Sequence, residues 1–137
     1  IRTRSEVAYL GMPLAADVHI PYMEHPFDAP WDDKNARFLL EPNNDFGLEM
    51  ARRMAEKGLG KSDVVILICR SGDRSAKAAN LLIDLGYTQA YTVVDGYEGD
   101  LANSGTQSGQ RAVNGWKNAG LPWSYKLDKH RLYFPKN

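Results

Sequence analysis

From Asp63 to Ser75 the sequence reads DVVILICRSGDRS. Residues 63–68 form an almost unbroken aliphatic run, which is typical of a strand buried on both faces of a parallel sheet. Residues 69–75 are small and polar and predict a loop. Residues 76–85 place apolar side chains at helical spacing, and Gly86 is suited to end a helix. This stretch therefore predicts a strand, a loop and a helix in succession.

A second short strand is predicted after this helix, over residues 90–94. Together the elements make a strand–helix–strand unit with a right-handed crossover, which favours an α/β fold. Upstream, we predict a short strand over residues 16–20, a Pro-rich loop over 21–42 and a helix that runs from the capping candidates at 43–45 to residue 57. The Gly-rich stretch 95–122 has no pattern that predicts an element.

The composition limits the class of protein. The chain has 137 residues, 43% of them hydrophobic, and no linker divides it, so we expect one domain over residues 1–137. Lys and Arg total 17, as do Asp and Glu, which argues against a nucleic-acid or membrane-binding patch. No aliphatic run is long enough to span a bilayer. A single cysteine and three scattered histidines exclude a disulfide and disfavour a zinc site.

The sequence begins at Ile1 without an initiator Met and in the middle of a pattern. We therefore expect residues upstream of it in the natural protein. The compartment stays open between cytoplasm and periplasm, because a targeting segment would lie in that part.

The loop between the predicted strand and helix carries the candidate chemistry. Ligands of α/β proteins bind at the carboxyl ends of strands, and a helix start offers unpaired N–H groups and a positive dipole end. A loop curled around Cys69 would aim N–H groups at its sulfur, Arg70 and Arg74 would add positive charge, and Gly72 would permit the curl. We expect the pKa of Cys69 to fall from about 8.5 into the range of about 3.5–7.5.

Cys69 and Ser75 each have an alternative interpretation. A lone cysteine after a buried strand is usually a small hydrophobic residue. The two arginines, the glycine and the helix start favour a nucleophile instead. Ser75 is expected to cap the helix while its backbone N–H serves the cysteine, although a substrate contact is the alternative.

The loop CRSGDRS, between its strand and its helix, resembles the active-site loop of rhodanese-type sulfurtransferases. Further segments occur in the family's order: RTRSE after its first strand, residues 11–22 leading into its second, 85–96 ending in a Gly-containing turn, and 115–122 at its close. The resemblance implies a three-layer rhodanese-like fold, in which helices flank a mainly parallel central sheet. The family's first strand would precede Ile1, together with an acidic residue before Arg2.

The resemblance also implies a reaction. Cys69 would accept a sulfane sulfur from thiosulfate or another persulfide donor and pass it to cyanide, a thiol or a protein acceptor. The substrate would be bound by the rest of the loop: Arg70, Ser71, Gly72, Asp73, Arg74 and Ser75. No metal and no organic cofactor is implied, and the partners would be a small anionic sulfur donor and its acceptor.

Three features leave alternatives open. Residues 99–114 are longer and more polar than the usual connection, and form either a flap at the catalytic mouth or a solvated surface loop. Arg111 within them is an anion ligand or an ordinary surface charge. Asp73 either weakens a thiosulfate site or points to water.

Two other functions compete with the sulfurtransferase. Anion-cradle phosphatases and arsenate reductases also place a cysteine before a helix start, but with five residues between Cys and Arg, whereas four separate Cys69 from Arg74. A persulfide carrier or regulatory module would use the same cysteine with slow turnover. A thioredoxin-like oxidoreductase is disfavoured because no second cysteine is present.

Overall fold

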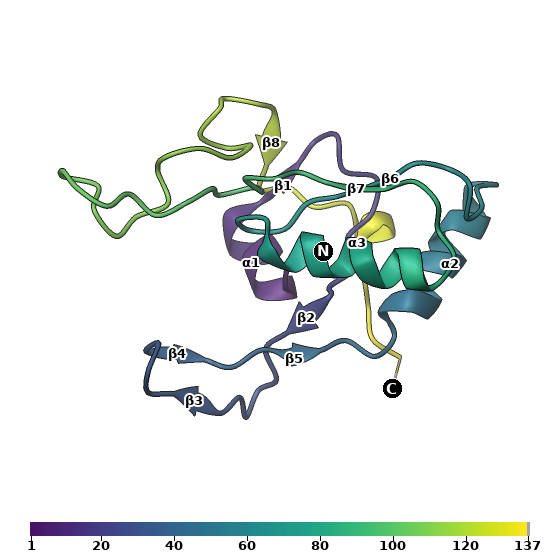
Figure 1. Cartoon of the computed structure of the whole chain (residues 1–137), viewed down its shortest axis with the longest axis horizontal. Helices are drawn as coiled ribbons and strands as arrows, with labels where there is room; N and C mark the ends of the chain where they lie inside the picture. Colours follow the sequence, from purple (N-terminus) through teal and green to yellow (C-terminus); the bar gives the residue numbers. More distant parts are fainter. Residues whose placement is uncertain (137) are drawn as a thin grey trace.

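A computed structural model describes residues 1–136 (Figure 1). Its helices are α1 (Arg4–Leu10), α2 (Phe46–Glu56), α3 (Asp73–Asp84) and the 3-10 helix η1 (Lys129–Arg131). Strands β6 (Val65–Leu67) and β7 (Ala90–Thr92) pair in parallel, and α3 connects them, which confirms the predicted strand–helix–strand unit. Within the described residues, no helix combines the length and hydrophobicity needed to cross a membrane.

Helix α3 begins earlier than the sequence predicted. It starts at Asp73 rather than at residue 76, and its N-cap is Gly72, whose φ of 109° lies in the left-handed region that glycine tolerates. The loop after β6 is therefore shorter than predicted. Ser75 lies inside the first helical turn, so the prediction that it caps the helix is wrong; its hydroxyl donates to the Gly72 carbonyl oxygen at 3.0 Å.

The hydrophobic core lies between the helices and one face of the parallel pair. Helix α2 follows Asp45 as predicted, although the Asp45 side chain makes no capping hydrogen bond. Side chains from α2, β6 and α3, together with Ile20 and Tyr87 from the connecting segments, form one buried cluster: Ile20, Phe46, Met50, Met54, Val65, Leu67, Ala78, Leu82 and Tyr87. This core holds the end of β6 and the start of α3 in a fixed relation.

Strand β6 is buried on one face only, so the expectation of two buried faces is wrong. Val65 and Leu67 are buried against the core, whereas Val64 and Ile66 are 52% and 66% exposed. The reason is that both α2 and α3 pack on the Val65 and Leu67 side. The whole of β6 also borders an apolar cavity, whose lining includes Val18 and Trp116.

The strands described by the structure form four separate pairs rather than one broad sheet. Apart from the parallel pair, β1 (Met12–Pro13) pairs with β8 (Trp123–Ser124), β2 (Met23–Glu24) with β5 (Glu41–Pro42), and β3 (Trp31–Asp32) with β4 (Arg37–Phe38), all antiparallel. The predicted strand over residues 16–20 does not form. Its N–H groups bind elsewhere, Ala16 to the Pro13 carbonyl oxygen and His19 to that of Arg131.

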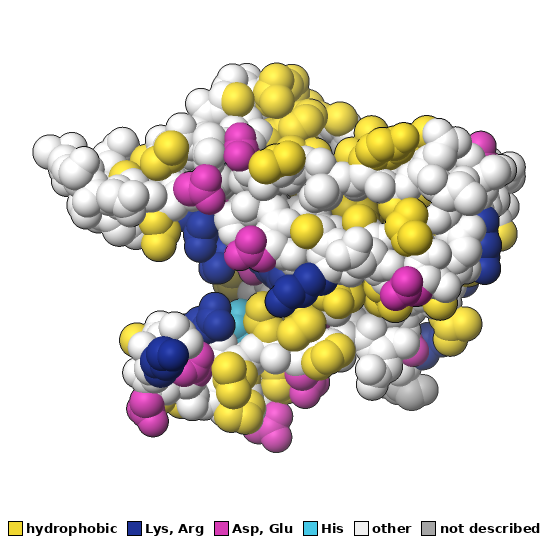
Figure 2. Space-filling view, viewed as in Figure 1, with side chains coloured by type: hydrophobic (Ala, Val, Ile, Leu, Met, Phe, Trp, Pro, Cys, Tyr) yellow, Lys and Arg dark blue, Asp and Glu magenta, His cyan; other side chains and the backbone are white. Residues whose placement is uncertain are grey.

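Two segments project from the same side of the molecule (Figure 1). The first, which we call the hairpin arm, spans residues 23–42 and replaces the predicted Pro-rich loop with short strand pairs; Trp31 and Phe38 pack edge to face at its end. The second, the loop arm, spans residues 99–114 and is held by bridges at Leu101–Arg111 and Ala102–Ser108. Figure 2 shows a hollow between the arms, with Lys and Arg side chains at its walls.

Candidate active site

Cys69 lies two residues after the end of β6, and its sulfur is surrounded by polar groups. The backbone N–H groups of Gly72 and Ser75 donate to Sγ at 3.1 and 3.3 Å, and the Ser75 hydroxyl lies 3.4 Å from it. The residue is only 1% exposed. Cys69 is thus buried among polar groups that can stabilise an anion, which is not the environment of an inert hydrophobic cysteine.

These donors outweigh the cost of burial. Burial by itself would raise the pKa of the Cys69 thiol, because it disfavours the charged form. The Ser75 hydroxyl and the N–H groups of Ser75, Gly72 and Ser71 act in the opposite sense, and the net pKa is lowered. The thiolate is therefore populated at a lower pH than in an ordinary cysteine.

This balance predicts the pH dependence of Cys69 alkylation by iodoacetamide. Only the thiolate reacts, so the rate should rise with pH and level off above an inflection that lies below the ordinary value of about 8.5. Ser75→Ala removes the hydroxyl that lowers the pKa of Cys69 and should move the inflection upward. Ser71→Ala is the matched control, since Ser71 contributes only its backbone N–H. An inflection at the ordinary value in the unmodified protein would contradict the role of these donors.

Two glycines allow the loop to close around the sulfur. A Cβ atom on Gly72 would stand 2.0 Å from the Val94 carbonyl oxygen, and one on Gly96 would stand 2.5 Å from the Arg70 carbonyl carbon. Both glycines have positive φ, at 109° and 68°. The turn after β7 therefore packs directly on the cysteine loop, and a side chain at either position would push the two apart.

Thr92 is a site residue that sequence analysis missed. It ends β7, and its hydroxyl forms a short hydrogen bond with the hydroxyl of Ser75. Thr92 thereby fixes the Ser75 side chain next to the sulfur. A signal for it was present, because Thr92 lies within the predicted strand 90–94, which was expected to run parallel to the strand before Cys69.

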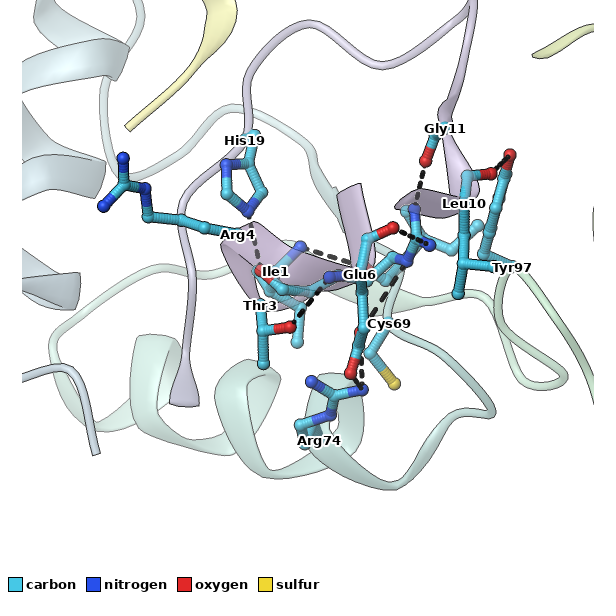
Figure 3. A network of polar contacts seen from close by, with 12 residues as sticks. Ile1, Thr3, Arg4, Glu6, Leu10, Gly11, His19, Cys69, Arg74 and Tyr97 are labelled. Carbon is cyan, nitrogen blue, oxygen red and sulfur yellow. Dashed lines mark hydrogen bonds and ion pairs between the residues drawn. The ribbon is translucent and has the colours of Figure 1, made fainter. Parts of the chain in front are cut away.

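Arg74 forms an ion pair with Glu6, a residue that the sequence analysis did not assign to the site. Both oxygens of Glu6 accept from Arg74 Nη2, at 2.8 and 2.9 Å, and Glu6 also lies 3.8 Å from Arg2 Nε (Figure 3). The buried Arg2 guanidinium in turn stacks over the Tyr97 ring at 4.0 Å. Arg74 thus joins α3 to α1, and its charge is largely compensated.

Arg70 and Asp73 differ in their surroundings. Within residues 1–136 Arg70 has no ion pair, and its buried Nε has no hydrogen-bond partner. Asp73 is exposed, so its side chain is in water. It lies in the first turn of α3, where a negative charge is favourable. Of the two alternatives for Asp73, the structure shows the second.

His19 is a structural histidine. Its Nε2 lies 2.6 Å from the Arg2 carbonyl oxygen, and the ring is 3% exposed (Figure 3). Burial lowers the pKa of His19 to about 3, so the ring is neutral at neutral pH and Nε2 donates to the carbonyl. His19 contacts the backbone beside the site and not the sulfur.

Comparison with protein-family models matches the chain to the Rhodanese-like domain over residues 4–103. The chain belongs to the rhodanese-like family. The match covers α1, the hairpin arm, the cysteine loop and the base of the loop arm. The family resemblance inferred from the cysteine loop and its flanking segments is therefore confirmed.

This rhodanese-like chain is also similar to a solved structure and to curated proteins. The crystal structure of Rv0390 from M. tuberculosis shares 30% identity and a TM-score of 0.59, over 92% of this chain and 81% of Rv0390. Two curated relatives, the uncharacterized proteins RP600 homolog of Rickettsia rickettsii and RC0915 of Rickettsia conorii, are each 29% identical over 127 residues. Each alignment covers 91% of this chain and 80% of the relative. The fold is thus rhodanese-like, although a broad parallel sheet is not formed by the described strands.

Proposed function

We propose that this protein is a sulfurtransferase that moves sulfane sulfur through a persulfide on Cys69. The donor is thiosulfate or another persulfide, and the acceptor is a thiophile such as cyanide or a thiol. The observation that carries the proposal is the set of backbone N–H groups that donate to Sγ at the junction of β6 and α3. Membership of the rhodanese-like family supports it.

The proposed reaction has two half-reactions. In the first, the Cys69 thiolate attacks the outer sulfur of thiosulfate, an S–S bond forms on Cys69, and the original S–S bond breaks. Sulfite leaves with the electron pair of that bond. In the second, cyanide attacks the outer sulfur of the persulfide, thiocyanate leaves, and the thiolate is regenerated. Because the protein alternates between two covalent states, its kinetics should be ping-pong.

The residues of the loop have separate roles in this scheme. The N–H groups of Ser71, Gly72 and Ser75 stabilise negative charge on the thiolate and on the persulfide. Arg70, which has no ion pair in the described chain, attracts the anionic donor. Arg74 positions the loop through Glu6 rather than binding the donor directly.

Mass spectrometry after exposure to thiosulfate tests the proposal. We expect one added sulfur atom per chain, mapped to Cys69 and removed by cyanide with formation of thiocyanate. Absence of the added sulfur with thiosulfate and with a small organic persulfide would contradict it. Turnover of an aryl phosphate in their place would support the anion-cradle phosphatase. Rapid loading combined with slow release to every small acceptor would indicate the persulfide carrier.

A further inference from the structure

The positive charges around Cys69 are not equally available to a ligand. Arg74 shares both oxygens of Glu6, and Arg2 lies close to the same carboxylate. Arg70 and Arg111, in contrast, form no ion pair with any residue in 1–136. The uncompensated positive charge of the site therefore belongs to these two arginines.

The fold connects Arg111 to the cysteine loop. The carbonyl oxygen of Arg70 accepts the N–H groups of Glu98 and Gly99, at 2.9 and 3.1 Å. The carbonyl oxygen of Gly99 accepts Nη1 of Arg111 at 2.7 Å. One peptide segment at the base of the loop arm thus holds Arg70 by its backbone and Arg111 by its guanidinium.

The backbone of Arg111 is itself fixed. The Asn118 side-chain amide donates to the carbonyl oxygens of Glu98, Arg111 and Asn114, at 3.1, 3.1 and 2.9 Å. Leu101 and Arg111 form a bridge across the base of the loop arm. Arg111 is therefore held at the base of the loop arm by several contacts, unlike an ordinary surface arginine.

Arg70 and Arg111 also act on each other electrostatically. Burial lowers the pKa of Arg70, and the charge of Arg111 is the next largest cause. The peptide of Gly99 bonds to both residues, because its N–H donates to the Arg70 carbonyl oxygen and its carbonyl oxygen accepts from Arg111 Nη1. Neighbouring positive charges repel each other, and an anion bound by both arginines would relieve that repulsion.

We propose that Arg70 and Arg111 together bind the oxyanion group of the sulfur donor, a sulfonate or a carboxylate, while its outer sulfur reaches Cys69. This inference rests on the proposed sulfur transfer and adds a donor-binding residue outside the loop motif. Guanidinium groups suit this ligand because their N–H groups match the oxygens of such an anion in pairs. With thiosulfate, the same pair would stabilise sulfite as charge builds up on the leaving group.

Arg111→Gln tests the proposal, because glutamine keeps a donor for the Gly99 carbonyl but removes the charge. The readout is the rate of sulfur loading on Cys69 against donor concentration, with thiosulfate, with an organic persulfide that carries a carboxylate, and with an uncharged alkyl persulfide. The thiosulfate concentration for half-maximal loading should rise about tenfold or more, as expected for loss of a charge-assisted hydrogen bond. Loading from the uncharged donor should change less than twofold.

Arg52→Gln is the matched control, since Arg52 lies on α2 and, among the described residues, its guanidinium forms hydrogen bonds with Glu49 and Glu56 alone. Equal effects of Arg111→Gln on charged and uncharged donors, or an effect no larger than that of Arg52→Gln, would overturn the proposal. The relative loss with the sulfonate and carboxylate donors shows which of the two oxyanions the arginine pair prefers.

A second measurement separates this inference from the proposed function. Sulfate or acetate should protect Cys69 from alkylation by neutral iodoacetamide, relative to chloride at equal ionic strength, and Arg111→Gln should abolish the protection. If the anions protect Cys69 from alkylation but no sulfur is loaded, the anion site is supported and the proposed sulfur transfer is refuted. Sulfur loading without protection, and without a loss in Arg111→Gln, would refute the anion site alone.

Discussion

Cys69→Ser should lower the rate of thiocyanate formation from thiosulfate and cyanide by at least about a thousandfold, the scale on which removal of a nucleophile acts. The oxygen of serine cannot carry the persulfide, and its hydroxyl remains protonated at neutral pH. The measurement is steady-state turnover together with the mass of the protein after exposure to thiosulfate. No added sulfur should be found on the variant.

Misfolding of the variant would also abolish its turnover, so the stability of the variant must be measured as well. Serine is close to cysteine in size and can accept the same N–H groups of Gly72 and Ser75. Thermal unfolding of the variant should therefore shift by only a few degrees, corresponding to about 1 kcal/mol. Turnover at the original level in a folded Cys69→Ser variant would remove the nucleophile from the scheme.

Gly72→Ala should produce the second largest effect. A Cβ at this position would meet the Val94 carbonyl oxygen at 2.0 Å, and the φ of 109° is unfavourable for alanine. The loop must move, and the Gly72 N–H would leave the sulfur. We expect turnover to fall by at least about tenfold, since one lost donor to an anion costs about 1.5–3 kcal/mol, and we expect unfolding to become easier by about 1–3 kcal/mol.

Gly60→Ala provides the control for that variant. A Cβ on Gly60 would meet nothing within 4 Å, and its φ is not positive. Its stability and turnover should match those of the unmodified protein. If Gly72→Ala behaved in the same way, the close contact between the cysteine loop and the turn after β7 would not hold the N–H groups in place.

The strand–helix–strand unit could be predicted because its signals are local. The aliphatic run before Cys69, the apolar spacing of α3 and the second short run each lie within a few residues. The start of α3 was placed late because Gly72 begins the helix from a left-handed conformation, which a pattern of apolar residues does not reveal. The side of β6 that would be buried depends on where α2 and α3 pack, and that is decided by tertiary contacts.

Only part of the candidate site could be predicted from the sequence, because some of its residues are distant from the cysteine loop in the chain. Cys69 and its loop are contiguous, so the chemistry of the nucleophile could be inferred from one short motif. Glu6 is distant in sequence, and only the folded chain brings it to Arg74. Thr92 likewise reaches the Ser75 hydroxyl from β7, and Arg111 bonds from the loop arm to Gly99, whose N–H binds the Arg70 carbonyl oxygen. The charge balance of the site could not be worked out without these partners.

The near-complete enclosure of Cys69, which is 1% exposed, limits the shape of molecules that can react there. A molecule that the Cys69 thiolate attacks must present a narrow end to it. A terminal sulfur atom meets that requirement, since nothing extends beyond it, whereas each sulfur of a disulfide carries a carbon chain. This restriction would protect Cys69 from exchange with disulfides, which forms mixed disulfides, while leaving it open to donors that end in a sulfur atom.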